Sequence, residues 1–271
     1  MDRGVLMPPA GKEEHTIVCD GLQLKGYFYE PGGERRKRPL LILCHGIPAA
    51  GRPEQAVANE ADERREQDGG YPALARRCLE EGFAVFQFNF RGTGESEGNF
   101  DLAGWRRDLA AVLAYLEKER GERAFLLWGF SAGAAVSCCV ASINSRVKGM
   151  VMAASPAEFF SLFPSRGRQR FLDMMRQRGI IRDPLFPPDP AQWLRQIYAA
   201  SPLQYIRAIA PRPLLIIHGS KDELIPCRHA FQLYRQAGPS ADLVIQPAAG
   251  HQMRRHSPSV ERCLRWLRKQ A

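Results

Sequence analysis

The stretch Ala124–Gly133, AFLLWGFSAG, decides how this chain folds. Its first half, up to Trp128, is a short and continuous apolar run, which is typical of a strand buried on both faces. Its second half, Gly129–Gly133, has the pattern Gly-x-Ser-x-Gly, and a run of small residues typical of a buried helix follows it. Because glycines on both sides of Ser131 allow close approach of chain segments, the pattern predicts a sharp strand-to-helix turn that presents the serine hydroxyl.

Strand-like and helix-like segments alternate on both sides of this turn. The expected core strands are Leu40–Cys44, Ala84–Phe90, Ala124–Gly129, Gly149–Ala154, Pro213–His218 and Asp242–Gln246. The expected helices are Tyr71–Glu81, Leu102–Glu119, Ala132–Ala141, Cys227–Gln236 and Val260–Lys269, with helical patches at Phe171–Arg178 and Ala191–Ala200. Repeated β-α-β units predict the α/β class, with a mostly parallel twisted sheet and helices on both faces.

The N-terminal part predicts a different pairing. The segments His15–Cys19 and Leu22–Tyr29 are strand-like and are separated only by Asp20-Gly21. This dipeptide favours a tight hairpin because both of its residues can adopt positive φ. We therefore expect an antiparallel hairpin at one edge of the sheet.

Two connections are longer than is usual between core elements. Ser155–Ala210 contains helical patches interrupted by several prolines, and an insertion of this size between two core strands is typical of a helical lid. Ile47–Gly70 is rich in Glu, Asp and Arg, and is expected to mix loop with a short exposed helix. We predict one domain over residues 1–271, with a lid insertion at about 155–210.

The composition is that of an ordinary globular protein. Hydrophobic residues make up 45% of the chain and charged residues 25%, so disorder and repeat architectures are poor explanations. No apolar run is long enough to span a membrane, and Met1–Glu14 lacks the apolar core of a signal peptide. We therefore expect a cytoplasmic protein without membrane contact.

The cysteines support the same compartment. There are seven, an odd number, and their spacing suits neither a disulfide framework nor a zinc site. Cys138 and Cys139 lie in the run of small residues after the serine, and Cys19 and Cys44 lie in strand-like runs. We expect free thiols that behave as small hydrophobic residues, which agrees with a reducing environment.

The net charge of +9 raises the question of an acidic partner. We recognise no nucleic-acid-binding module, so no nucleic-acid partner is expected. The basic residues concentrate in Ser165–Arg182, where a single Asp173 accompanies several arginines. They are Arg166, Arg168, Arg170, Arg176, Arg178 and Arg182. This stretch is either a solvated helix face or a surface that attracts an anionic substrate, and the sequence leaves both interpretations open.

A nucleophilic serine needs a base, and the base needs an acid that orients it. Asp222 comes shortly after the strand Pro213–His218, and His251 comes shortly after the next strand. Both therefore lie at the carboxyl ends of strands, where α/β sheets carry their chemistry, and in the order Ser, Asp, His. We predict Ser131 as nucleophile, His251 as base and Asp222 as the supporting acid.

Other titratable residues compete for these roles. Glu223 is a rival acid because it is adjacent to the predicted one, and His218 is a rival base. His218 ends the strand that positions the acid, so we expect a structural role for it. His15, His229 and His256 are expected at the surface.

The tetrahedral intermediate of acyl transfer needs two backbone N–H donors aimed at its oxyanion. Ala132, immediately after the serine, is expected to supply one of them. The other is expected from the loop His45–Pro48 after the first core strand. Pro48 has no N–H, so we predict Ile47 as the second donor, with His45 bracing the loop.

Together these motifs resemble the α/β-hydrolase superfamily, and within it the bacterial esterases and acyl-peptidase-like serine hydrolases. The motifs are His45-Gly46, Phe90–Gly98 (FRGTGESEG), Gly129–Gly133, the Asp222 loop and Gly250-His251. They span most of the chain, and their joint occurrence is specific for the α/β-hydrolase fold. The resemblance also implies that the loop Phe90–Gly98 packs beside the active site, where we expect Arg91 to pair with Asp108.

The resemblance implies a reaction through an acyl-enzyme on the serine. A carboxylesterase acting on small to medium acyl esters is the leading expectation; a thioesterase, an amidase or a peptidase would use the same machinery. Dehalogenases and epoxide hydrolases of this fold use an aspartate nucleophile, and dienelactone hydrolases use a cysteine. A non-catalytic binding protein is the alternative of another class, and it would be expected to lack one of the three catalytic residues.

Aromatic side chains near the serine are candidates for substrate contact. We predict that Phe130, Phe159 and Phe163 line the substrate pocket. The further candidates from the lid are Phe160, Leu162, Phe171, Met174 and Met175. The sequence leaves open whether the lid residues line a pocket or only pack the lid against the core. The sequence implies no metal and no organic cofactor. The expected partner is a small-molecule ester or related acyl substrate, and the sequence leaves homo-oligomerisation and the natural substrate open.

Overall fold

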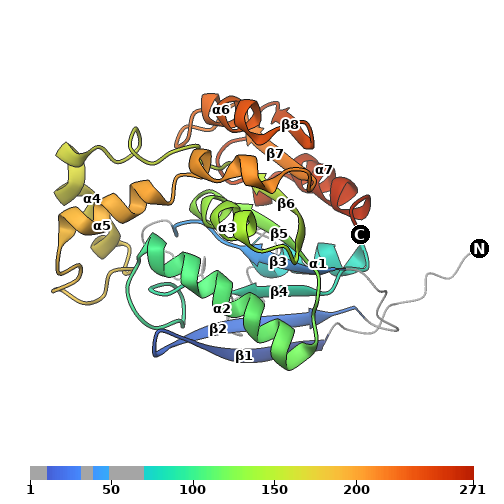
Figure 1. Cartoon of the computed structure of the whole chain (residues 1–271), viewed down its shortest axis with the longest axis horizontal. Coiled ribbons are helices and arrows are strands. Elements are labelled where there is room, and N and C mark those ends of the chain that lie inside the picture. The colour runs from blue at the N-terminus through green and yellow to red at the C-terminus, as the bar shows by residue number, and fades with distance from the viewer. Residues whose placement is uncertain (1–10, 32–38, 49–69) are drawn as a thin grey trace, which may run out of the picture.

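The computed structural model describes residues 11–31, 39–48 and 70–271, and its strands form one mixed sheet (Figure 1). The strands are β1 (Gly11–Cys19), β2 (Leu22–Glu30), β3 (Leu40–Cys44), β4 (Val85–Phe88), β5 (Phe125–Phe130), β6 (Val147–Ala153), β7 (Leu214–Gly219) and β8 (Ala241–Gln246). Their order across the sheet is β1-β2-β4-β3-β5-β6-β7-β8. β2 is antiparallel to β1 and to β4, and all later neighbours are parallel. The predicted sheet is thus confirmed.

The N-terminal hairpin turns at the predicted dipeptide. Asp20 has φ 53° and Gly21 has φ 76°, so both residues occupy the left-handed region that a two-residue hairpin turn requires. Cys19 pairs with Leu22 directly across this turn. The hairpin therefore adds the antiparallel edge of the sheet, as expected.

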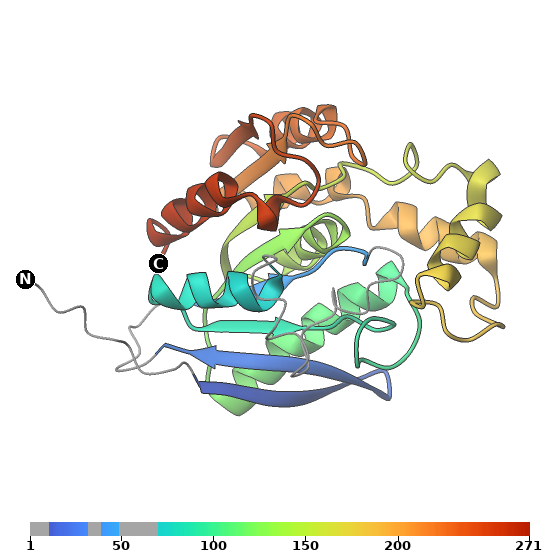
Figure 2. The same ribbon diagram turned by 180° about the vertical axis from the view of Figure 1, so that it is seen from behind.

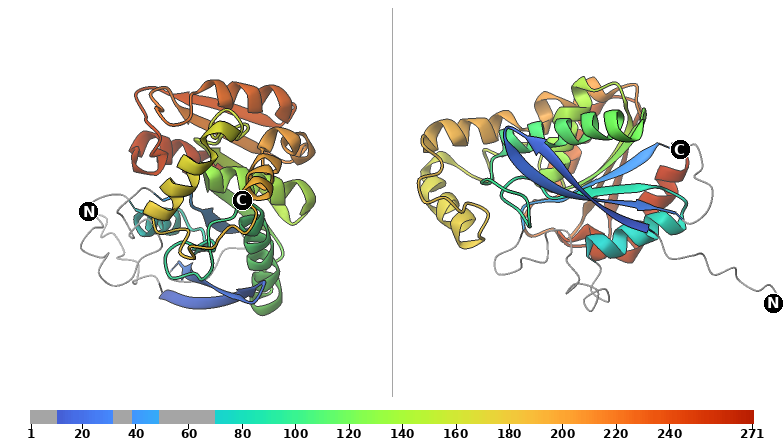
Figure 3. Two further views of the ribbon diagram at one scale, coloured as in Figure 1. Left: turned by 90° about the vertical axis from the view of Figure 1, so that its left-hand side faces the viewer. Right: turned by 90° about the horizontal axis from the view of Figure 1, so that it is seen from below.

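Helices cover both faces of the sheet. The helices are α1 (Tyr71–Glu80), α2 (Leu102–Arg120), α3 (Ala132–Ile143), α4 (Arg168–Gln177), α5 (Pro190–Ala199), α6 (Arg228–Ala237) and α7 (Ser257–Arg268). Short 3₁₀ turns are η3 (Ser165–Gly167), η4 (Pro202–Gln204), η5 (Ile206–Ile209) and η6 (Met253–Arg255). α2, α3 and α6 pack on one face, and α1 and α7 pack on the other (Figure 3). Among the described helices, none has the length and apolarity to cross a membrane.

The central strands are buried on both faces, which explains their continuous apolar runs. Every residue of β3 and β5 is buried, and the two hydrophobic cores lie on opposite sides of them. α3 packs its small side chains against β5, and Cys138 and Cys139 lie buried within it. All seven cysteines are free, as predicted. The rigid centre of the fold therefore lies directly beneath the turn at Ser131.

The long segment between β6 and β7 carries α4, α5 and three 3₁₀ turns. α4 and α5 extend beyond one end of the sheet (Figure 2), whereas η4 and η5 pack against α3 and α6. Its two helices match the predicted helical patches, with α5 capped by the side chain of Asp189, which accepts from two backbone N–H groups of its first turn. Whether this segment works as a lid is a question of function. The helix expected within 47–70 falls on residues 49–69, which are outside the described part of the chain.

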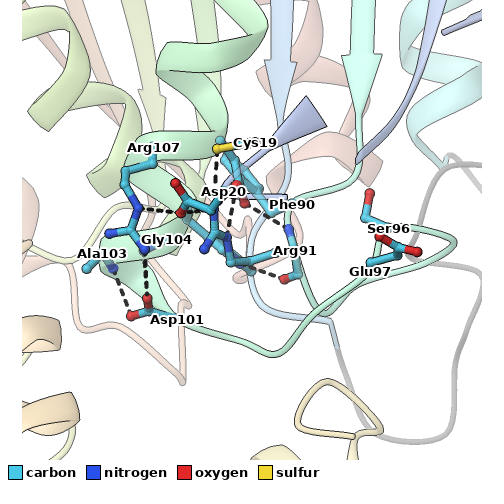
Figure 4. A network of polar contacts seen from close by, with 12 residues as sticks. Cys19, Asp20, Phe90, Arg91, Ser96, Glu97, Asp101, Ala103, Gly104 and Arg107 are labelled. Atoms are coloured by element: carbon cyan, nitrogen blue, oxygen red, sulfur yellow. Dashed lines mark hydrogen bonds and ion pairs between the residues drawn. The ribbon is translucent and has the colours of Figure 1, made fainter. Parts of the chain in front are cut away.

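The pairing of Arg91 with Asp108 is confirmed. It belongs to a network of polar contacts that joins three parts of the chain, and Figure 4 shows Arg91 of this network beside Asp20. Arg91 Nη2 lies 2.6 Å from Asp108 Oδ1, and the Arg91 backbone N–H donates to Asp108 Oδ2 at 2.9 Å. The same guanidinium reaches Asp20 in the hairpin turn at 2.8 Å. This buried network therefore connects the loop after β4, the helix α2 and the β1–β2 hairpin.

Two histidines predicted at the surface are buried instead. His15 is packed in β1, where its Nδ1 lies 3.0 Å from the hydroxyl of Tyr115. His229 is buried on α6, where its Nδ1 accepts from the backbone N–H of Ala157 at 3.2 Å. Burial lowers the pKa of both imidazoles, which favours the neutral form. The surface prediction was wrong because a neutral imidazole is apolar enough for a core once one ring nitrogen has a partner.

Candidate active site

Ser131 lies between β5 and α3 in a backbone conformation that few residues adopt. Its φ is 53° and its ψ is −125°, outside the regions that residues with a Cβ normally occupy. The surrounding hydrogen bonds hold it there: its N–H donates to Ala153 O in β6 at 2.9 Å, and its carbonyl accepts from Ala134 in α3. The turn therefore presents the side chain of Ser131 at the carboxyl end of the sheet.

The two glycines of the motif are required by close approach. A Cβ added at Gly129 would overlap the backbone of Ala134, and one added at Gly133 would overlap the carbonyl of His45. Both neighbours are backbone atoms, one in α3 and one in the loop after β3, so a Cβ could be accommodated only if the backbone shifted. The sharp strand-to-helix turn predicted from the Gly-x-Ser-x-Gly pattern is present.

His251 and Asp222 meet at the ends of neighbouring strands. His251 Nδ1 lies 2.8 Å from Asp222 Oδ2, and because a carboxylate can only accept, Nδ1 must donate. The proton is thereby held on Nδ1, and Nε2 keeps the lone pair that a general base uses. The other oxygen, Oδ1, accepts from the backbone N–H groups of Leu224 and Ile225.

The surroundings of Asp222 stabilise its charge. Burial alone would raise the pKa of this carboxyl, but hydrogen bonds from His218 and His251 and from the loop backbone bring it well below its usual range. Asp222 is therefore an anion throughout the neutral pH range. Such an anion both orients the His251 ring and stabilises an imidazolium formed there.

The rival residues lie elsewhere. Glu223 is exposed, and it is the side chain of Asp222 that contacts His251. His218 is buried, and its Nε2 lies 2.7 Å from the carbonyl of Ile225 and 3.2 Å from Asp222 Oδ2. Because both neighbours are acceptors, Nε2 carries a proton, so His218 supports the loop that holds Asp222.

The loop after β3 packs directly against Ser131. A Cβ at Gly46 would lie 2.9 Å from Ser131 Cβ, so the backbone that leads into Ile47 passes beside the serine. Ala132 is the first residue of α3, and the N–H groups of a first helical turn have no partner within the helix. The structure therefore brings both predicted donors, Ile47 and Ala132, next to Ser131.

His45 braces this loop as expected. Its Nε2 lies 3.1 Å from the backbone N–H of Phe90 and must accept, so the proton is on Nδ1, which donates to Gly46 O at 2.8 Å. Complete burial lowers the pKa of His45 to about 4, so the ring is neutral near pH 7. One side chain thus ties the loop after β3 to the loop after β4.

A cavity of about 340 Å³ opens in front of Ser131 and His251. Its wall combines residues from the sheet ends with residues of the long β6–β7 segment and of η6. The described lining residues are Gly46, Ile47, Tyr71, Phe130, Ser131, Leu162, Phe163, Met174, Met175, Arg178, Leu224, His251, Gln252 and Arg254. The nucleophile and the base predicted from the sequence therefore face the same space.

The predicted pocket residues divide into two groups. Phe130 and Phe163 line the cavity, as do Leu162, Met174 and Met175. The candidates Phe160 and Phe171 are not among its described lining residues, since Phe160 is exposed and Phe171 is buried. Phe159 is not among the described lining residues; it is buried behind Phe163, with the two rings stacked at 6.3 Å. The sequence could not distinguish the two positions, because this segment has no regular hydrophobic periodicity. Without such a periodicity, the sequence does not show which aromatic side chains point toward the cavity.

Several lining residues were not predicted. Tyr71 begins α1 and packs edge-on against Phe130 at 5.5 Å, and Arg254 lies three residues beyond His251. Proximity to His251 in the sequence could have identified Arg254, whereas nothing local distinguishes Tyr71 from an ordinary first residue of a helix. Across residues 11–31, 39–48 and 70–271, no three His, Cys, Asp or Glu side chains group together as metal ligands would.

The sequence over the first part of this fold matches a known family. A family model described as alpha/beta hydrolase fold matches residues 39–190, which is more than half of the chain. The protein therefore belongs to the α/β-hydrolase family. The match includes the loop after β3, the turn at Ser131 and the start of α5.

The individual proteins that this chain resembles share a low sequence identity with it. The chain is 27% identical over 261 residues to the uncharacterized protein YfhR of Salmonella typhi, covering 90% of this chain and 75% of the relative. It is 24% identical over 222 residues to the uncharacterized peptidase YtmA of Bacillus subtilis, and the match covers 80% of this chain and 75% of that relative. The solved esterase Pf2001 of Pyrococcus furiosus superposes with a TM-score of 0.68 at 20% identity, covering 96% of this chain and 93% of that one. At this identity the superposition establishes the shared fold alone.

Proposed function

We propose that this protein is a serine hydrolase that cleaves carboxylic esters of small to medium acyl groups. The observation that carries the proposal is the contact between His251 Nδ1 and Asp222 at 2.8 Å, with Ser131 and His251 lining the same cavity. This contact leaves His251 Nε2 as a base toward the cavity side. Relatives named as a peptidase and an esterase support hydrolysis of an acyl bond.

The proposed reaction has two steps. Ser131 Oγ attacks the acyl carbon while His251 Nε2 takes its proton, and the N–H groups of Ala132 and Ile47 stabilise the oxyanion. The intermediate collapses when the C–O bond breaks and His251 returns the proton to the leaving alcohol. Water then attacks the acyl-enzyme with the same base, and the carboxylic acid is released from Ser131.

We further propose that the segment between β6 and β7 covers the cavity as a lid. Leu162, Phe163, Met174 and Met175 of this segment contribute an apolar wall, which suits the hydrocarbon part of an ester. The seven free cysteines support residence in the reducing cytoplasm. Fractionation of the source cells, with the protein followed by antibody, tests that location.

The experiment that tests the function compares wild type with Ser131→Ala on three substrates sharing one acyl group: the p-nitrophenyl ester, the thioester and the anilide of butyrate. We expect the wild type to hydrolyse the ester with the highest kcat/KM, and Ser131→Ala to lose at least roughly 10⁵-fold in kcat. A higher kcat/KM for the thioester or the anilide would assign the protein to those classes instead.

A fluorophosphonate label provides the matching chemical test. We expect one adduct, on Ser131, as located by peptide mass spectrometry. Absence of both labelling and hydrolysis in a folded sample would identify a non-catalytic binding protein of the same fold.

A further inference from the structure

Two arginines enter the cavity from different elements. Arg178 follows the last residue of α4, and Arg254 belongs to η6 just beyond His251. The described residues that line the cavity include neither aspartate nor glutamate. Two arginines therefore line the same cavity as Ser131 and His251, and no carboxylate among the described lining residues compensates them.

Arg254 is packed over an aromatic ring and lacks a full set of partners. Its guanidinium lies 5.0 Å from the ring centroid of Tyr71, and its Nε is buried without a hydrogen-bond partner in the described part of the chain. Burial lowers the pKa of this arginine, because its charged form is disfavoured away from water. An anion in the cavity would offset that penalty.

Arg178, at the end of α4, is likewise partly buried and lacks a full set of hydrogen-bond partners. Its Nη1 donates to the carbonyl of Pro48 at 3.1 Å, which holds the side chain beside the loop that carries Ile47. Its Nε is buried and, within the described residues, has no hydrogen-bond partner, and burial lowers its pKa as well. Arg178 is thus anchored at one nitrogen and unsatisfied at another.

The other arginines of the Ser165–Arg182 stretch differ. Arg182 donates to the carbonyls of Ser96 and Gly94, so it fastens this stretch to the loop after β4. Arg176 also has a buried Nε without a partner among the described residues, but its Nη2 donates to the carbonyls of Pro184 and Phe186 and it is not a described lining residue. Arg166, Arg168 and Arg170 are exposed. The structure therefore separates one arginine that faces the cavity from others that brace the fold or meet solvent.

We infer that the ester cleaved at this site carries a free carboxylate, which binds between Arg178 and Arg254 while its hydrocarbon part lies against Phe163 and Met174. The inference rests on the proposed function, since it names the substrate class of the same cavity. A guanidinium donates two parallel hydrogen bonds to a carboxylate, and in a partly desolvated cavity such pairs are strong. A neutral ester of equal length would offer neither guanidinium a carboxylate to bind.

Calorimetry on the Ser131→Ala variant tests the anion site without turnover. Monomethyl adipate carries one carboxylate, and dimethyl adipate is its neutral counterpart. We expect monomethyl adipate to bind at least tenfold more tightly, and Arg178→Met or Arg254→Met in the same background to remove most of that preference. Arg254→Lys keeps the charge and should retain part of it, whereas Arg170→Met, an exposed arginine of α4, should leave the preference unchanged.

Kinetics on the wild-type protein give the second measurement. The ratio of kcat/KM for p-nitrophenyl hydrogen adipate over p-nitrophenyl hexanoate should fall at least tenfold in Arg178→Met and in Arg254→Met, and should stay constant in Arg170→Met. The carboxylate site is overturned if Ser131→Ala binds both adipates within twofold, or if the preference survives both substitutions.

The two proposals fail in different ways. If the wild type hydrolyses no ester faster than Ser131→Ala, the esterase activity is wrong, and calorimetry still decides whether the cavity selects an anion. If hydrolysis proceeds without any preference for the charged ester, the esterase activity stands and the carboxylate site is wrong.

Discussion

At the scale of single residues, Asp222 divides its two oxygens between different tasks. Oδ1 accepts from the loop backbone at Leu224 and Ile225, and Oδ2 accepts from His251. An amide in place of the carboxylate can donate to His251 Nδ1 and so place the imidazole proton on Nε2. We therefore expect Asp222→Asn to lower kcat by roughly 10⁴-fold, measured with p-nitrophenyl butyrate near pH 7.

Glu223→Gln is the matched control, because Glu223 was the rival acid and is exposed. Its kcat should remain within about twofold of wild type, as is usual for an exposed residue outside the site. A loss in Glu223→Gln as large as that in Asp222→Asn would contradict the assigned roles.

His45 links stability to pH. The unfolded chain takes up a proton at this residue near its ordinary pKa of 6.5, whereas the folded protein does so only at a pKa of about 4. The unfolded state therefore binds more protons between these values, so the free energy of unfolding decreases as pH falls from 6.5 to 4. The loss from this residue is about 3 kcal/mol, and it is complete below pH 4.

His45→Gln isolates this contribution, since the buried His15 and His229 act in the same direction. The glutamine can still accept a hydrogen bond from Phe90 but does not titrate. Urea unfolding between pH 4 and pH 7, followed by circular dichroism, should show a shallower pH dependence in the variant. Parallel curves for the two proteins would refute the assignment.

At the scale of elements, the β6–β7 segment uses its aromatic residues in two ways. Phe163 forms the cavity wall, whereas Phe159 is buried behind it. Phe163→Ala should enlarge the cavity and raise the kcat/KM ratio of the octanoate to the butyrate ester by about tenfold. The measurement is a chain-length series of p-nitrophenyl esters.

Phe159→Ala is expected to act on stability instead. Removal of a fully buried ring lowers the free energy of unfolding by about 3–5 kcal/mol, measured by urea unfolding, with the chain-length preference of wild type retained. If Phe163→Ala changes stability alone and Phe159→Ala changes the preference, the two positions have been assigned in reverse.

At the scale of the whole molecule, the Arg91 network joins elements that are distant in sequence. Asp108 is fully buried, so Asp108→Asn leaves the charge of Arg91 poorly compensated and should lower the free energy of unfolding by about 3–5 kcal/mol. Asp20 holds the same guanidinium but is partly exposed, so Asp20→Asn should cost less than about 1 kcal/mol. Equal losses for both variants, measured by urea unfolding, would argue against burial as the cause.

The fold could be read from the sequence because its signals are local and repeated. Continuous apolar runs such as Leu40–Cys44 need both faces of a sheet covered, and the Asp20-Gly21 dipeptide permits few turns other than a hairpin. The signal for the strand-to-helix turn at Ser131 was also local, because its two glycines are required by close contacts with neighbouring backbone. Each of these features is decided by steric limits within a short stretch of chain.

The pairing of Asp222 with His251 could be anticipated for a related reason. Consecutive parallel strands end on the same edge of a sheet, so residues just beyond β7 and β8 must lie close together. The choice of Asp222 over Glu223 is geometric, and it follows from the hydrogen bonds that turn the Asp222 side chain inward. The sequence alone does not show which of these two adjacent side chains points toward His251.

The amino-acid sequence by itself determined the α/β sheet, the strained turn at Ser131 and the order of serine, aspartate and histidine along the chain. Only the tertiary structure decided that His15 and His229 are buried, that Phe163 rather than Phe159 forms the cavity wall, and that Arg178 and Arg254 line the same cavity. The physical reason is the distance along the chain over which the deciding contacts act. Strand, turn and strand-end positions follow from neighbours in the chain, whereas the composition of a cavity depends on how separate elements pack against one another.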